Sequence, residues 1–213
     1  MHGPGYFVSF EGPDGGGKST QAAKLARFLR REGHLVYLVR EPGYTRVGEA
    51  IRRIVLSPVY PELEPLTEFL LFAASRAQLT SKVIRPALSE GSIVVADRYA
   101  DSSVVYQGVG RGLGVDLVRK VNCIATGGLV PDLTILLDVP AVLGLQRVQH
   151  RRPQDRLEQL ELHETVRQAY LDLAHAEPER FVLVDASPSL EEVAKTVQAL
   201  VVHRLAGRQN RGR

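Results

Sequence analysis

Five short apolar runs recur along the chain, and a stretch of helical periodicity separates each run from the next. The runs are residues 6–10, 35–40, 92–96, 133–138 and 181–184. Continuous apolar strands that alternate with helices are typical of a parallel sheet covered on both faces. The pattern therefore predicts an α/β fold with a five-stranded parallel sheet and helices on both sides.

Apolar residues spaced three and four positions apart predict the helices between these strands. The longest is expected over residues 67–90, where Gly91 ends it. The others are expected over residues 20–31, 47–56, 115–125, 141–149, 162–176 and 190–205. The alternation shows no internal repeat and no second-domain boundary, so residues 1–206 are expected to form a single domain.

Polar residues stand where the predicted strands end. Asp14 follows the first strand, Arg40 and Glu41 follow the second, and Asp97 and Arg98 follow the third. Open parallel sheets bind ligands beyond the carboxyl ends of their strands. We therefore expect the ligand site at this edge of the sheet.

Residues 12–19 fit the phosphate-binding pattern G-x-x-x-x-G-K-[ST] and stand between the first strand and the first helix. Glycines let such a loop turn its N–H groups toward an anion, and the helix N-terminus adds partial positive charge. A turn that only caps a helix needs no Lys-Ser pair in this register, so the motif predicts ATP or GTP binding. The expected contacts are Gly12, Pro13, Asp14, Gly15, Gly16, Gly17, Lys18, Ser19 and Thr20.

Composition agrees with one globular domain. The chain has 213 residues, of which 44% are hydrophobic, so it can bury a sizeable core. It contains no apolar run of bilayer-spanning length and no visible signal-peptide pattern, so we expect a cytoplasmic protein. Its single cysteine, Cys123, excludes an intrachain disulfide and is expected to lie in the core, because it falls within a helical apolar pattern.

The formal net charge is +3, and it comes from the end of the chain. Residues 207–213 hold three arginines and no acidic residue, so the rest of the chain is neutral. A neutral body requires no basic face, and we expect no nucleic-acid partner. Residues 207–213 are expected to form a disordered basic tail.

The phosphate loop alone is compatible with a small-molecule kinase, a GTP-binding switch protein or an ATPase that acts on nucleic acid. The Asn-Lys-x-Asp run with which GTPases usually bind guanine is missing from the sequence. The neutral body argues against a nucleic-acid motor. Arginines at the strand ends favour phosphoryl transfer between two anionic small molecules, because arginine binds phosphate through paired hydrogen bonds.

Several sequence blocks carry a more specific resemblance. They are residues 10–14, 40–43, 48–52, 71–76, 97–108, 131–134 and 155–158, in order over residues 6–205. On these blocks the chain resembles the bacterial thymidylate kinases, which are P-loop nucleoside monophosphate kinases. The resemblance implies transfer of the γ-phosphoryl of ATP to dTMP with Mg²⁺, in a homodimer packed through the long helices. The nearest alternative is another, or a less selective, deoxynucleoside monophosphate kinase.

The resemblance also implies roles for the residues around the phosphates. Lys18 would hold the ATP phosphates, and Ser19 and Asp97 would bind Mg²⁺. Arg98 would clamp the dTMP phosphate. Asp14 would accept a hydrogen bond from the dTMP 3′-hydroxyl or help to order Mg²⁺.

For the base, the resemblance implies that Phe72 stacks on thymine and that Arg76 donates to its O4 atom. The two residues stand four apart and share one helix face, although core packing is the alternative for Phe72. The other dTMP contacts that it implies are Arg40, Glu41, Arg52, Ser103, Tyr106 and Gln107.

Residues 147–158 are expected to form a lid over ATP. Some family members carry an arginine inside the phosphate loop, where this chain has Gly15 and Gly16, so another cation must reach the moving phosphoryl group. Arg151 and Arg156 are the expected catalytic candidates, and Arg147 and Arg152 the expected ATP contacts. A solvated, charge-rich loop is the alternative.

Tyr44 departs from the family pattern, which usually has a second glycine after Arg-Glu-Pro-Gly. A tyrosine adopts positive φ only at an energetic cost, so the turn near Arg40 is expected to differ in geometry. The link between residues 155–158 and His163 is also about two residues shorter than the family pattern.

Overall fold

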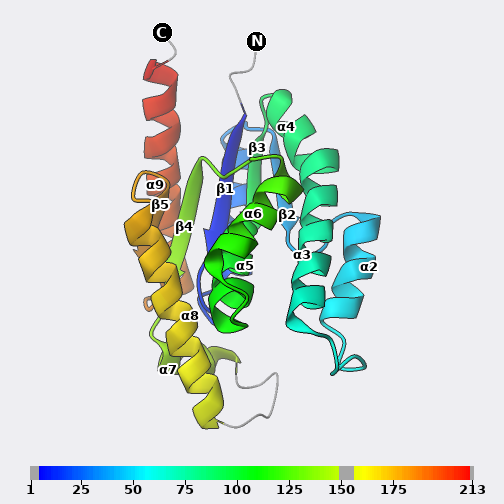
Figure 1. Ribbon diagram of the computed structural model, residues 1–213. Helices are drawn as coiled ribbons and strands as arrows, with labels where there is room; N and C mark the ends of the chain where they lie inside the picture. The colour runs from blue at the N-terminus through cyan, green and yellow to red at the C-terminus, as the bar shows by residue number, and fades with distance from the viewer. Residues whose placement is uncertain (1–4, 149–155, 212–213) are drawn as a thin grey trace.

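The computed structural model describes residues 5–148 and 156–211. Its centre is a parallel five-stranded sheet in the order β2-β3-β1-β4-β5 (Figure 1). The strands are β1 (Tyr6–Glu11), β2 (Val36–Arg40), β3 (Ile93–Asp97), β4 (Leu133–Asp138) and β5 (Phe181–Asp185). The predicted fold class is confirmed, and the predicted strand ends differ from the observed ones by one residue at most.

Helices follow every strand. They are α1 (Lys18–Arg31), α2 (Arg46–Val55), α3 (Pro65–Leu79), η1 (Thr80–Ile84), α4 (Arg85–Ser89), α5 (Ala100–Ser103), η2 (Val104–Gly110), α6 (Val115–Thr126), α7 (Ala141–Val148), α8 (Arg156–Ala176) and α9 (Leu190–Arg211). The predicted long helix is present as α3, η1 and α4 in direct succession. Its middle widens into a π-helical turn just before Pro86, which has no N–H group for a regular helical bond. The helical segment α5–η2 was not predicted.

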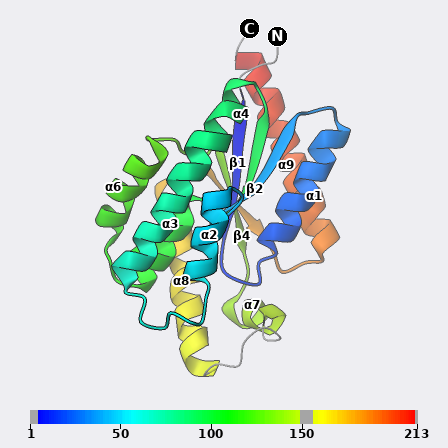
Figure 2. The same ribbon diagram turned by 90° about the vertical axis from the view of Figure 1, so that its right-hand side faces the viewer.

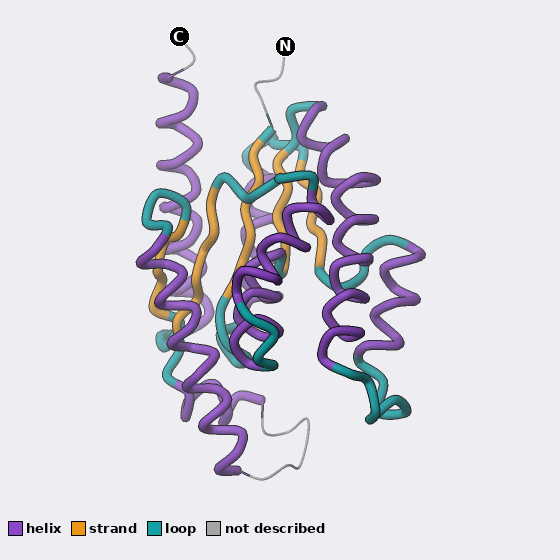
Figure 3. The backbone as a smooth tube through the Cα atoms, in the orientation of Figure 1, coloured by secondary structure: helices purple, strands orange, loops and turns teal. Residues whose placement is uncertain are grey.

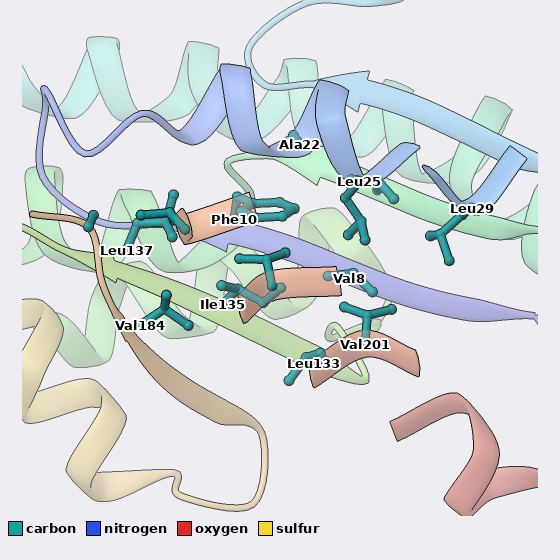
Figure 4. Close-up of a cluster of buried hydrophobic side chains, with 14 of the residues drawn as sticks. Val8, Phe10, Ala22, Leu25, Leu29, Leu133, Ile135, Leu137, Val184 and Val201 are labelled. Atoms are coloured by element: carbon teal, nitrogen blue, oxygen red, sulfur yellow. The ribbon is translucent and has the colours of Figure 1, made fainter. Parts of the chain in front are cut away.

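The sheet is buried on both faces. Figure 2 shows α1 and α9 on one side and α3, α6 and α8 on the other. Between the sheet and the first pair of helices, Val8 and Phe10 of β1 pack with Leu25 of α1 and Val201 of α9 (Figure 4). The opposite face carries Phe7 and its neighbours against η1 and α4. Because helices cover both faces of the sheet, the side chains on both sides of the strands are mostly apolar, and the strands appear in the sequence as continuous apolar runs.

All five strands run from the end at which the N-terminus enters the sheet toward the loops at the opposite end (Figure 3). Those loops follow the carboxyl ends of the strands and carry the polar residues singled out above. The polar ends of β1, β2 and β3 are therefore neighbours at one edge, since β3 pairs with both β1 and β2.

Two expectations at the periphery are wrong. Cys123 is exposed, because α6 turns Val118 and Asn122 toward the interior instead. The tail expected to be disordered from residue 207 continues α9 to Arg211, and Arg208 donates to the backbone oxygen of Gly5 at 2.7 Å. Across residues 5–148 and 156–211, no helix combines the length and the apolar character needed to cross a membrane.

Candidate active site

The loop between β1 and α1 has the backbone of a phosphate-binding nest. Gly12, Gly15 and Gly17 have φ values of 133°, 83° and 81°. A Cβ atom at Gly12 would lie 2.4 Å from the oxygen of Leu137, and one at Gly15 would lie 2.2 Å from the oxygen of Gly144. Glycine is therefore required at both positions, for conformation and for space.

Lys18 begins α1 and is buried against this loop. Its Nζ donates to the backbone oxygen of Pro13 at 2.7 Å and lies 3.7 Å from Oδ1 of Asp14. Burial and the charge of Arg98 lower the pKa of Lys18 to about 8, although nearby carboxylates oppose this shift. A polyanion at the loop would raise this pKa again and favour the charged form.

Ser19 and Asp97 meet at the carboxyl ends of neighbouring strands. The Ser19 hydroxyl donates to Oδ2 of Asp97 at 2.5 Å. Asp97 pairs with Phe10 in the parallel register of β3 and β1, which brings the end of β3 beside the loop. Hydroxyl and carboxylate oxygens are ligands that Mg²⁺ accepts together with water and phosphate oxygens, so this pair fits the expected metal site.

Arg98 is the centre of a polar network. Its Nη2 donates to Oδ1 of Asp14 at 2.5 Å and to the hydroxyl of Tyr106 at 3.3 Å. Its Nη1 donates to the hydroxyls of Ser102 at 3.0 Å and Tyr170 at 3.3 Å. The backbone of Arg98 has a φ of 71°, which is uncommon for a residue with a side chain. The side chain remains 21% exposed, so the guanidinium is oriented but still reaches the solvent.

Glu11 lies behind this network and is fully buried. Its carboxylate accepts hydrogen bonds from the backbone nitrogen of Tyr99 at 2.7 Å, from Ser102 at 2.6 Å and from Tyr170 at 2.9 Å. Burial raises its pKa to about 7, and Asp101 adds to the rise. The sequence analysis gave no role to Glu11, Ser102 or Tyr170. A carboxylate at the end of an apolar strand was the available signal, since buried carboxylates need partners.

Arg76 is the centre of a second polar cluster, and it is buried, with 1% of its side chain exposed. It forms an ion pair with Glu41, donates to the Ser103 hydroxyl at 2.7 Å and donates to the side-chain oxygen of Asn122. Within the described part of the chain, Arg76 Nε and Glu41 Oε2 make no hydrogen bond. The structure thus brings together Arg76, Ser103 and Glu41, three of the residues expected to contact dTMP.

The carboxyl end of β2 presents Arg40, whose Nη2 donates to both carboxylate oxygens of Glu49 at 2.9 Å. Arg52 donates to the backbone oxygen of Pro42 at 2.9 Å. Tyr44 adopts the left-handed conformation, with a φ of 69°, and its N–H donates to Glu49 at 2.7 Å. The turn therefore accommodates Tyr44 in a conformation that favours glycine, and Glu49 is a partner that the sequence analysis did not identify.

The remaining base-side candidates come from α3 and η2. Phe72 is half-buried on α3, and Gln107 is buried on η2. The Gln107 amide donates to Glu68 at 3.0 Å, which fixes its orientation relative to α3. Burial raises the pKa of Tyr106 to about 12, so its hydroxyl stays protonated.

Arg147 is the lid candidate that the structure describes in full. It lies in the last turn of α7 and donates to the backbone oxygens of Gly15 at 3.3 Å, Ala186 at 2.8 Å and Ser187 at 3.1 Å. It thus links the phosphate loop to the loop after β5. Arg151 and Arg152 lie outside the described residues, as does the side chain of Arg156.

Comparison with known proteins gives a consistent result. A family model described as thymidylate kinase matches residues 10–197. The thymidylate kinase of Deinococcus radiodurans is 52% identical over 202 residues, which cover 94% of this chain and 98% of that protein. The thymidylate kinase of Lactobacillus helveticus is 47% identical over 206 residues, which cover 94% and 97%. A crystal structure of thymidylate kinase from Ehrlichia chaffeensis superposes with a TM-score of 0.77 at 29% identity and covers 95% of this chain and 100% of that chain.

Proposed function

The chain belongs to the thymidylate kinase family and transfers a phosphoryl group from ATP to dTMP, and on this premise we propose which residues carry each part of the reaction. One observation carries the assignment. Lys18 and Arg98 approach the same carboxylate oxygen of Asp14, at 3.7 Å and 2.5 Å. A lysine of the donor loop and an arginine of the acceptor side are therefore close enough to hold two phosphate groups in contact.

On the donor side, the loop from Gly12 to Thr20 cradles the ATP phosphates through its N–H groups, and Lys18 binds the β- and γ-phosphates. Ser19 and Asp97 would hold Mg²⁺, which neutralises charge on the phosphate oxygens when it is bound. Phosphoryl transfer needs little covalent chemistry from the protein, so positioning and charge neutralisation account for these roles.

On the acceptor side, Arg98 binds the dTMP phosphate, with Arg40 and Arg52 nearby at the end of β2 and on α2. Burial alone would raise the pKa of Asp14, but Arg98 and Lys18 hold it below its usual value. Asp14 is therefore an acceptor at neutral pH, suited to the sugar 3′-hydroxyl or to water around Mg²⁺.

The base site is built on α3 and η2. Phe72 stacks on thymine, and Arg76 donates to its O4 atom from a sealed position. Ser103, Gln107 and Tyr106 line the base edge and the sugar side. The support for this assignment is the hydrogen bonding that holds Arg76 to Ser103 and Gln107 to α3.

We propose that residues 147–158 close over ATP, with Arg147 and Arg152 as ATP contacts and Arg151 and Arg156 as the groups that act on the moving phosphoryl. Arg147 supports the first part, since it already donates to the phosphate-loop oxygen of Gly15. Replacing each of the four arginines by Ala should identify one variant that lowers kcat more than ATP affinity. Four variants with near-parent kcat would contradict the lid mechanism.

We also propose a homodimer formed through α3 and α6. These helices contact each other, and they expose Leu66, Leu70, Leu117 and Ile124 to between 44% and 82%. A row of exposed apolar side chains on two neighbouring helices favours a protein partner, and a second copy of the chain fits the family. Sedimentation of an Ile124→Glu variant should give a monomer where the parent gives a dimer.

The central test measures ADP release with and without dTMP. Turnover should require dTMP, and the Lys18→Ala variant should keep the fold and lose most of that turnover. Lys24→Ala is the matched control and should keep the turnover, because Lys24 lies on the same helix but pairs with Glu191 on the surface. ATP hydrolysis stimulated by DNA, or a folded Lys18→Ala variant with near-parent turnover, would contradict the proposal.

A further inference from the structure

We propose that Glu11 is a positioning residue for Arg98 and acts through the hydroxyl groups of Ser102 and Tyr170. The proposal rests on the assignment of Arg98 to the dTMP phosphate, and it explains how that guanidinium is held. Glu11 itself does not touch Arg98 directly. The two hydroxyls stand between them, each within hydrogen-bond distance of both groups.

The direction of the hydrogen bonds follows from the chemistry of the carboxylate. When Glu11 is ionised it can only accept, so Ser102 and Tyr170 then both donate their hydroxyl protons to its Oε2 atom. Each hydroxyl oxygen then turns its lone pairs toward Arg98 Nη1, which can only donate. Glu11 thus sets the polarity of both hydroxyls and makes two acceptors for one end of the guanidinium.

The two hydroxyls orient the Nη1 end of Arg98 without a charged partner at that end, while Nη2 pairs with Asp14. Nη1 is occupied by the two hydroxyls, which leaves Nη2 directed at Asp14 and Tyr106 on the open side of the site. A buried carboxylate in direct contact with Arg98 would compete with the dTMP phosphate for the same donors. Two neutral hydroxyls give the same orientation and add no second carboxylate to the one that Asp14, which is 53% exposed, already presents to Nη2.

Glu11 also holds the backbone at which Arg98 stands. Its Oε1 accepts from the N–H of Tyr99 at 2.7 Å, and the N–H of Arg98 donates to Phe10 at 3.1 Å. The end of β1 therefore accepts hydrogen bonds from Arg98, which has the left-handed conformation, and from Tyr99, which follows it. These bonds stabilise a φ of 71° that a residue with a side chain rarely adopts.

The cost of burying Glu11 supports a specific role. Burial raises its pKa to about 7, so the site opposes the charge that it contains. A glutamine of the same shape would avoid much of that penalty. However, glutamine has one acceptor oxygen, whereas Glu11 accepts from one N–H group and two hydroxyls. The three accepted bonds require the carboxylate.

The test compares Glu11→Gln with Ser9→Ala in the full-length chain. Ser9 stands two residues earlier on the same buried strand and pairs with Thr134 at 3.0 Å, away from Arg98, so it is a matched control. Glu11→Gln should lower kcat/KM for dTMP by about tenfold or more and leave KM for ATP within about twofold. Ser9→Ala should change neither.

A double-mutant cycle with Arg98→Met separates positioning from general stability. If Glu11 acts through Arg98, Glu11→Gln should weaken dTMP binding in the parent and have less than about a twofold effect in the Arg98→Met background. Equal effects in the two backgrounds, or equal losses for ATP and dTMP, would overturn the inference. If Glu11→Gln does not fold, the Ser102→Ala/Tyr170→Phe variant keeps the bond to Tyr99 and takes its place in the same cycle, with the same outcomes.

The same data distinguish this inference from the assignment beneath it. If Arg98→Met leaves dTMP binding unchanged, Arg98 is not the acceptor clamp and the positioning role of Glu11 falls with it. If Arg98→Met weakens dTMP binding but the substitutions at Glu11 do not, only the positioning role is wrong.

Discussion

Arg76, which is buried, and Arg98, which is partly exposed, meet their carboxylates in different ways. Arg76 contacts Glu41 directly, and their side chains are 1% and 2% exposed. Arg98 reaches the buried Glu11 only through two hydroxyls, and its direct partner Asp14 is 53% exposed. Arg98 follows strand β3 directly, whereas Arg76 comes from helix α3 and meets Glu41 just after strand β2.

The difference corresponds to what each arginine is proposed to bind. A directly paired and sealed guanidinium is neutralised, which suits hydrogen bonding to an uncharged base. A guanidinium held by hydroxyls and by an exposed carboxylate keeps its charge available, which suits a phosphate. On this proposal, the distance to the carboxylate and the exposure of the guanidinium adapt the same residue type to two ligands.

The largest effect is expected on the unfolding free energy when the buried ion pair of Arg76 and Glu41 is broken. Arg76→Met leaves Glu41 buried without a counter-charge and should cost about 3–5 kcal/mol of unfolding free energy. Arg98→Met should cost less, because Asp14 can turn to solvent. Urea denaturation of both variants checks the contrast. Adding Glu41→Leu to Arg76→Met should recover much of the lost unfolding free energy. If Arg98→Met loses as much stability as Arg76→Met, the contrast between the two arginines is wrong.

The next effect is catalytic and belongs to Arg98. Arg98→Lys keeps a positive charge but loses the planar fork that binds phosphate and both hydroxyls. We expect kcat/KM for dTMP to fall about a hundredfold, comparable to the loss of a transition-state hydrogen-bond donor. ATP affinity should change little. Steady-state kinetics with each substrate varied in turn check this. If Arg98 binds ATP instead, kcat/KM should fall for ATP and change little for dTMP.

A smaller effect is expected for base recognition. Arg76→Ala should weaken dTMP use by about 1.5–3 kcal/mol, the contribution of a hydrogen bond from a charged donor, and weaken ATP use far less. Because this variant is also expected to be less stable, Arg76→Lys provides a folded comparison that keeps a charge beside Glu41. Equal losses for dTMP and ATP in both variants would make Arg76 purely structural.

The unfolding free energy should depend on pH in a way that reports the ionisation of Glu11. Its pKa is about 7 in the folded protein and lower in the unfolded chain, so the folded state binds more protons between about pH 4.5 and 7. Stability should therefore fall as the pH rises through that window, by at most about 1.4 kcal/mol per pH unit, and this contribution should level off above it. The charged or titratable groups around Glu11 are Arg98, Asp101, Lys18, Tyr106 and Tyr170.

The check is a difference measurement. Unfolding free energies of the parent and of Glu11→Gln, measured across that pH range, should differ by an amount that changes with pH, because glutamine does not titrate. Parallel curves would mean that Glu11 keeps an ordinary pKa.

The smallest effect concerns the two residues with positive φ, Tyr44 and Arg98. Tyr44→Gly should stabilise the fold by about 0.5–1 kcal/mol, because glycine adopts this conformation without strain. Arg98→Gly relieves the same strain but should abolish dTMP binding. Thermal denaturation of Tyr44→Gly that shows a loss of stability would mean that the tyrosine side chain contributes packing that outweighs its strain.

Features that depend on neighbouring residues could be predicted from the sequence. The apolar run of residues 133–138 matches β4 at both ends, and the glycines, lysine and serine of residues 12–19 identified the phosphate loop. Strand and helix periodicity, turn glycines and motif spacing involve only a few neighbouring residues, so they can be recognised in the sequence alone. The family resemblance added the reaction and the candidate residues.

Which of those residues contact one another depends on how the chain packs and could not be predicted from the sequence. Glu11 and Tyr170 are 159 residues apart, and Arg76 meets Asn122 across 46 residues. Such contacts depend on the strand order, which sets β1 between β3 and β4, and on which face each helix turns inward. The exposure of Cys123 was mispredicted for the same reason, since an apolar pattern on a helix does not say which side another element covers. Burial and long-range pairing are properties of the packed chain, and they are what distinguish the arginine proposed as a base ligand from the one proposed as a phosphate clamp.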